Sequence, residues 1–153
     1  MAETDLILAG QTETSLPTRA DAEVGPLALD TKARLHVTPT PVLGTEFSLV
    51  GSASTNSTLV KSSAVNLFEI SVSNPTAAIV YLKLYNKSSA PTVGTDVPRL
   101  TIAVPVNSEK AYEFGFVGKR FPLGLGVAIT AGSTAADVAA VAVGVQVHAT
   151  YLS

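Results

Sequence analysis

The chain has 153 residues, of which 14% are charged and 46% are hydrophobic, and its net charge at pH 7 is −2. This length fits one domain with an extension and is enough to bury an apolar core. A typical soluble protein has about 25% charged residues, so free copies of this chain have few charges to keep them apart and are expected to assemble. The absence of cysteine excludes a disulfide framework and thiolate metal sites.

The first 45 residues are expected to form an extended arm. Residues 1–30 hold six acidic residues and one basic residue, whereas the rest of the chain holds nine bases and six acids. Prolines and the lack of a hydrophobic period argue against a packed layer in this part. The start of the chain is acidic, so we expect no export signal, and no apolar segment approaches the ~18 residues of a membrane span. The predicted organisation is an arm over residues 1–45 and a sandwich domain over residues 46–153.

From about residue 45 the chain alternates apolar and other residues in short segments. This period of two is typical of strands with one buried face, because successive side chains point to opposite faces. Turn signals such as Asn74-Pro75 and Gly132-Ser133 separate the segments. We predict strands at residues 47–50, 58–61, 66–73, 78–85, 99–104, 110–117, 125–130 and 139–151. The pattern favours an all-β fold, an antiparallel β-sandwich that is jelly-roll-like, with an extended N-terminal arm.

The same alternation predicts which side chains are buried. In the segment at residues 78–85, Leu82 lies on the core face and Lys83 on the opposite face, where we expect it to be exposed. The predicted core residues are Val80, Leu82, Leu84, Ile102, Phe114, Phe116, Val127, Ile129, Val143 and Val145.

No constellation of residues predicts catalysis or metal binding. The two histidines, His36 and His148, are far apart in the sequence, and zinc catalysis needs about three protein ligands. Residues 115–120 superficially resemble a phosphate loop, but the glycine spacing is wrong and no Ser or Thr follows Lys119. We interpret this segment as a strand end that turns at Gly118, with Lys119 and Arg120 exposed and Phe121 folding back toward the core. We predict no catalytic, cofactor-binding or metal-ligating residues and no cofactor, and we expect the chain not to be an enzyme.

Nucleic-acid binding and sugar binding are the two binding functions that would compete with a structural role. The isoelectric point is about 5.6 and the bases are scattered, so nucleic-acid binding is not expected. Tyr81, Tyr85 and Tyr112 could form an aromatic platform for a sugar, although aromatic side chains more often simply stabilise sheets. A glycan-active enzyme would need a pair of carboxylates at a spacing of about 5 to 10 Å, which the sequence does not indicate.

A linked series of turn motifs resembles a pattern in virion proteins of tailed bacteriophages. The series starts at Asn74-Pro75, continues through the loop at residues 90–98 and includes Gly118-Lys119-Arg120-Phe121. It ends with the closing segment at residues 137–151, so the resemblance covers residues 70–151, about half of the chain.

The resemblance implies a small, non-enzymatic β-sandwich on a virion, made in the host cytoplasm and displayed on the capsid surface. The leading hypothesis is a homotrimeric capsid decoration (cement) protein that binds and stabilises the lattice of the major capsid protein. Neither nucleic acid nor membrane is an expected partner. The alternative is a tail, baseplate or fibre module that could contact host glycans.

Overall fold

The computed structural model describes residues 44–153, so the arm predicted over residues 1–45 lies almost entirely outside the described residues. Strands are the only regular secondary structure in residues 44–153, which contain no helix. The strands are β1 (Thr45–Val50), β2 (Thr58–Lys61), β3 (Val65–Asn74), β4 (Val80–Asn86), β5 (Leu100–Val104), β6 (Ser108–Glu113), β7 (Lys119–Phe121), β8 (Leu125–Thr130) and β9 (Gln146–Leu152).

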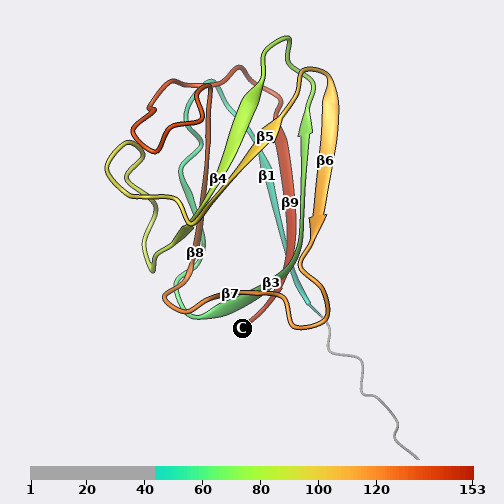
Figure 1. Cartoon of the computed structure of the whole chain (residues 1–153), viewed down its shortest axis with the longest axis vertical. Helices are drawn as coiled ribbons and strands as arrows, with labels where there is room; N and C mark the ends of the chain where they lie inside the picture. The colour runs from blue at the N-terminus through green and yellow to red at the C-terminus, as the bar shows by residue number, and fades with distance from the viewer. Residues whose placement is uncertain (1–43) are drawn as a thin grey trace, which may run out of the picture. The chain divides into compact units, whose positions relative to one another are not determined.

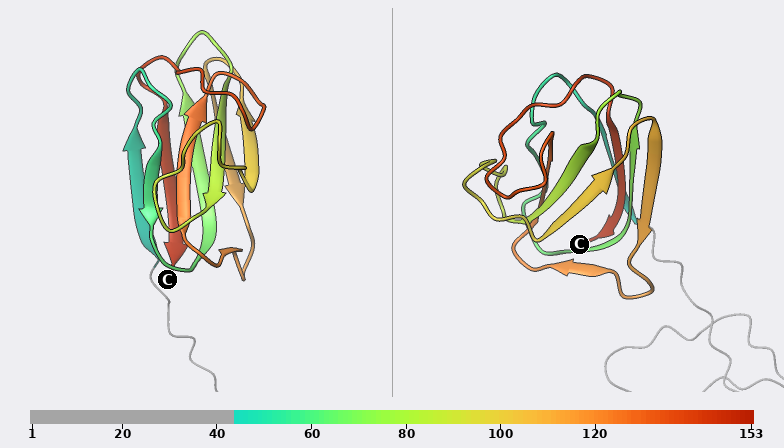
Figure 2. Two further views of the ribbon diagram at one scale, coloured as in Figure 1. Left: turned by 90° about the vertical axis from the view of Figure 1, so that its left-hand side faces the viewer. Right: turned by 45° about the horizontal axis from the view of Figure 1, so that its top comes forward.

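The strands form two antiparallel sheets (Figure 1). The first sheet has the order β1-β9-β3-β6, and the short strand β7 pairs with the beginning of β3. The second sheet has the order β2-β8-β4-β5. Figure 2 shows both sheets from two further directions. This part of the chain is therefore all-β, and its two antiparallel sheets are consistent with the predicted β-sandwich.

The core is built from the inward-facing residues of both sheets. Val65 and Leu67 of β3 are buried at odd positions, whereas Ile70 and Val72 are buried at even positions. A shift in register between Leu67 and Glu69 explains this switch, because one extra residue in a strand reverses the faces of the residues that follow. Strand β8 of the second sheet is buried at every position. Its outer face is covered as well as its inner face.

Most of the predicted core is confirmed. Buried residues are Val80, Leu82, Leu84, Ile102, Val127, Ile129 and Val145, and Phe114 is partly buried against them. Phe116 and Val143 were predicted wrongly, since Phe116 is 100% exposed and Val143 is 65% exposed. Strand β6 ends at Glu113 and strand β9 begins only at Gln146, so both residues lie in connecting segments. The alternation of apolar residues in the sequence therefore extends past the end of β6 and begins before the start of β9.

Lys83 was also predicted wrongly, because its side chain is buried. The loop between β8 and β9, residues 131–145, covers the outward side of β4 at this position. The Lys83 Nζ donates hydrogen bonds to the carbonyl oxygen of Thr134 at 2.6 Å and to that of Asp137 at 3.3 Å. A strand residue on the outer face thus anchors a loop, which strand alternation alone cannot predict.

Strand β7 was not predicted from the sequence. Its three residues are too few to show an alternating pattern, and it is recognised only by its pairing with residues 65–67 of β3. It places Phe121 in the core, fully buried, with the Arg99 guanidinium 5.5 Å from the centre of the ring.

Candidate functional site

The three tyrosines do not assemble into a platform. Tyr81 and Tyr85 lie on β4 of the second sheet, whereas Tyr112 lies on β6 of the first. Tyr85 is only 1% exposed, and its hydroxyl group has no hydrogen-bond partner among the described residues. Burial raises the pKa of Tyr85, and the nearby Asp96 carboxylate raises it further. The sugar platform considered from the sequence is therefore not formed.

The histidines do not form a metal site in the described part of the chain. His148 lies on β9 with an exposed side chain, and His36 lies outside the described residues. Within residues 44–153 no group of three or more His, Asp or Glu side chains is arranged to hold a metal ion. The same residues include no helix that is long and apolar enough to cross a membrane.

The segment that superficially resembled a phosphate loop forms a tight, projecting turn. Gly115 and Gly118 have φ values of 70° and 71°, a conformation that favours glycine. The Gly118 N–H donates to the Gly115 carbonyl oxygen at 3.2 Å, which closes the turn. Phe116 and Val117 lie between the glycines and are 100% and 76% exposed. We call residues 115–118 the apolar turn.

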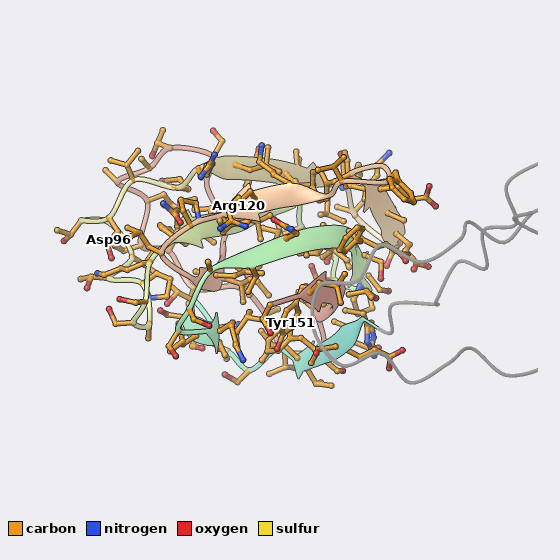
Figure 3. The ribbon with its side chains drawn as sticks, turned by 90° about the horizontal axis from the view of Figure 1, so that it is seen from below. Asp96, Arg120 and Tyr151 are labelled. Atoms are coloured by element: carbon orange, nitrogen blue, oxygen red, sulfur yellow. The ribbon has the colours of Figure 1, made fainter. Side chains whose placement is uncertain are left out.

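Basic residues follow the apolar turn directly. Lys119 is half-buried and Arg120 is exposed, and both belong to β7. Figure 3 shows Arg120 on this strand from below. The Arg120 guanidinium donates a long hydrogen bond of 3.4 Å to the Asn66 side chain on β3. The apolar turn therefore leads directly into the two cations at the start of β7. The interpretation that the chain turns at Gly118 and returns Phe121 to the core is confirmed.

The outer face of the first sheet is acidic. Strand register places Glu46 opposite Thr150, Thr150 opposite Glu69, and Glu69 opposite Glu113. Residues directly opposite each other share a face, so these three carboxylates lie in one row across the sheet. The sole ion pair within residues 44–153 joins Lys87 to Asp96, so no described cation pairs with the row. Like charges directly opposite destabilise a sheet, which makes this row unfavourable in an isolated subunit.

A hollow of about 490 Å³ lies on this acidic face. The side chains that face it carry carboxylates, hydroxyl groups and an imidazole, whereas those of Phe47 and Ala149 face the core on the other side of the sheet. Its lining residues are Glu46, Phe47, Ser48, Glu69, Ser71, His148, Ala149 and Thr150. They come from three strands, β1, β9 and β3, and were not predicted from the sequence, because only the register of distant strands brings them together. We call this feature the acidic hollow.

The two aspartates of residues 44–153 have structural roles. A hydrogen bond from the Lys87 ammonium lowers the pKa of Asp96, and the Thr92 N–H lowers it further. The backbone N–H of Gly132, which donates to Asp137 Oδ2 at 2.6 Å, lowers the pKa of Asp137. Both carboxylates organise loops over the second sheet.

No protein-family model, no curated protein and no solved structure matches this chain.

Proposed function

We propose that this chain is a non-enzymatic structural protein of a bacteriophage virion, a decoration (cement) protein that binds the major capsid protein lattice and stabilises it. The observation that carries the proposal is the strand order. The resemblance of residues 70–151 to phage virion proteins is independent support.

The strand order supports a jelly-roll. When β7 is set aside, β1 pairs with β9, β2 with β8, β3 with β6 and β4 with β5. This is the pairing of one long antiparallel hairpin, and its successive pairs lie alternately in the first and the second sheet. Eight-stranded, double-sheet jelly-rolls recur in viral capsid and lectin domains. A virion role fits this architecture, and a lectin role has less support because the tyrosines do not converge.

Exposed apolar side chains support a role in assembly. Phe116, Val117 and Val97 are 100%, 76% and 79% exposed, and all three lie in connections between strands. Apolar side chains at loops are available to a partner without disturbing the core. We propose that copies of this chain associate as a homotrimer and contact the major capsid protein on the capsid surface, after synthesis in the host cytoplasm, with no nucleic-acid or membrane partner.

Imaging of labelled particles tests the proposal. An antibody against this chain, bound to intact phage particles, is expected to label the head surface at many positions. Label confined to the tail or its fibres would instead favour the alternative of a tail, baseplate or fibre module. Binding of the purified chain to an array of host glycans would then test whether that module recognises a sugar. A particle without label at any position would contradict both virion roles.

A further inference from the structure

We infer that the apolar turn of one copy docks into the acidic hollow of a neighbouring copy, where Lys119 and Arg120 face Glu46 and Glu69. This inference rests on the proposed self-association and names the two surfaces that produce it.

The apolar turn has the properties of an interface anchor. The ring of Phe116 is not packed within its own domain, because the side chain is 100% exposed. Two glycines with positive φ hold the turn, and a Cβ on Gly118 would lie 2.9 Å from the Leu67 carbonyl oxygen, so the base of the turn is tightly fitted. The turn projects beyond the sheets at the connection from β6 to β7 (Figure 2, right). A rigid aromatic side chain that enters a partner's pocket is a common source of binding free energy.

The acidic hollow is a suitable receptor in size and chemistry. Its volume of about 490 Å³ exceeds that of one aromatic side chain and lies within the ~300 to 1,000 Å³ range of typical binding pockets. The imidazole of His148 and the methyl group of Thr150, which lie on the outer face, offer contact to an aromatic ring. Glu46 and Glu69 at the same surface offer negative charge to a cation that arrives beside the aromatic ring.

Charge complementarity identifies a second copy as the occupant. The face that holds the hollow carries the row of Glu46, Glu69 and Glu113, with no cation partner in residues 44–153. The apolar turn is followed at once by Lys119 and Arg120. Opposite charges arranged in this way direct association and suppress contacts between two acidic faces. Docking would relieve the repulsion within the glutamate row.

The proposed contact joins two different surfaces, and a head-to-tail arrangement of such contacts is heterologous. Such contacts form a closed ring when the rotation between subunits permits it, and the expected homotrimer is one such ring.

The first experiment measures the mass of the full chain in solution by light scattering during gel filtration. Phe116→Asp and Glu69→Lys are each expected to weaken self-association at least tenfold, because one removes the anchor and the other reverses the charge of its receptor. Both side chains are exposed, so both variants are expected to fold, which circular dichroism checks. Leu123→Asp and Glu109→Lys are matched controls, because Leu123 is an exposed apolar residue of another loop and Glu109 lies outside the lining of the hollow.

The second experiment mixes the two monomeric variants. Phe116→Asp retains an intact hollow and Glu69→Lys retains an intact turn, so one good contact is possible between them. The expected product is a one-to-one heterodimer that grows no further. Monomers only in the mixture, or controls that weaken association as much as the test variants, would overturn the inference.

The inference and the proposed function can fail separately. A wild-type chain that remains monomeric, on particles whose heads are labelled, would overturn the docking but not the virion role. A wild-type oligomer that responds to both variants, on particles without label, would retain the docking and refute the virion role.

Discussion

The ammonium of Lys83 lies 2.6 Å from the carbonyl oxygen of Thr134, although the two residues are 51 positions apart in the sequence. The contact attaches the loop at residues 131–145 to the outer side of β4. Burial lowers the pKa of Lys83, and the nearby Asp137 carboxylate opposes this shift. The loop is therefore part of the folded domain and covers a sheet face that would otherwise be open to water.

Replacing Lys83 by Met is expected to lower the free energy of unfolding by about 1 to 3 kcal/mol, because two carbonyl oxygens lose their donor. Leu82→Ala is expected to cost about 2 to 5 kcal/mol through lost burial and a cavity. Urea unfolding measures both. Lys110→Met, at an exposed position on β6, is the control and is expected to change stability by less than about 0.5 kcal/mol. A Lys83 variant as stable as this control would contradict the anchoring role.

Gly118→Ala is expected to destabilise the domain more than Gly115→Ala. Both glycines have positive φ, which costs a side chain roughly 1 to 2 kcal/mol. A Cβ at position 118 also meets the Leu67 carbonyl oxygen at 2.9 Å, whereas a Cβ at position 115 meets nothing within 4 Å. Thermal unfolding of the two variants separates the shared backbone cost from the steric cost. Equal losses would show that the base of the turn can move.

Acid is expected to destabilise the domain partly through Asp137. The folded state lowers the pKa of Asp137 below its ordinary value of 3.8, so its contribution to stability is complete above that pH and is lost as the pH falls through the folded pKa. Asp137→Asn should therefore be less stable than wild type near pH 6, and the difference should shrink toward about pH 2. Unfolding in urea across this range, with Glu109→Gln as the control, measures the effect. A difference that stays constant with pH would exclude the carboxylate charge as its source.

Deletion of residues 1–30 is expected to leave the domain folded and to weaken attachment to the particle or to other copies. These residues hold six acids and one base, so docking on a basic surface should weaken as salt screens charges over ~8 to 10 Å. Binding of the truncated and full chains to particles, measured at low and high salt, tests this. Unfolding of the truncated chain would show that the arm contributes to the core, and unchanged binding would refute the tether.

The sequence predicted most strands because one face of each is apolar, as in Val80, Leu82 and Leu84. It failed where a turn ended a strand early and where a distant segment covered an outward face. Phe116 continues the alternation of β6 but lies beyond the strand, between two glycines with positive φ. Lys83 occupies an outward position, yet a loop from a remote part of the chain covers it.

The acidic hollow illustrates the same limit for a functional site. Glu46 and Glu69 are unremarkable in the sequence, and each is the sole acid of its strand. They become neighbours on one face only because β9 lies between β1 and β3. Single-sequence reasoning predicts the face of a residue within a strand, but not which strands are adjacent.

The position of β9 has a consequence for how the chain folds. Although β9 is the last strand in the sequence, it lies inside the first sheet, between β1 and β3. Until β9 has been synthesised, β1 has no partner in its own sheet, and the apolar faces of β3 and β8 remain incompletely covered. Folding that waits for such distant pairings is slow and exposes intermediates to aggregation. We therefore expect a nascent chain of this protein to be most prone to aggregation before β9 has been synthesised.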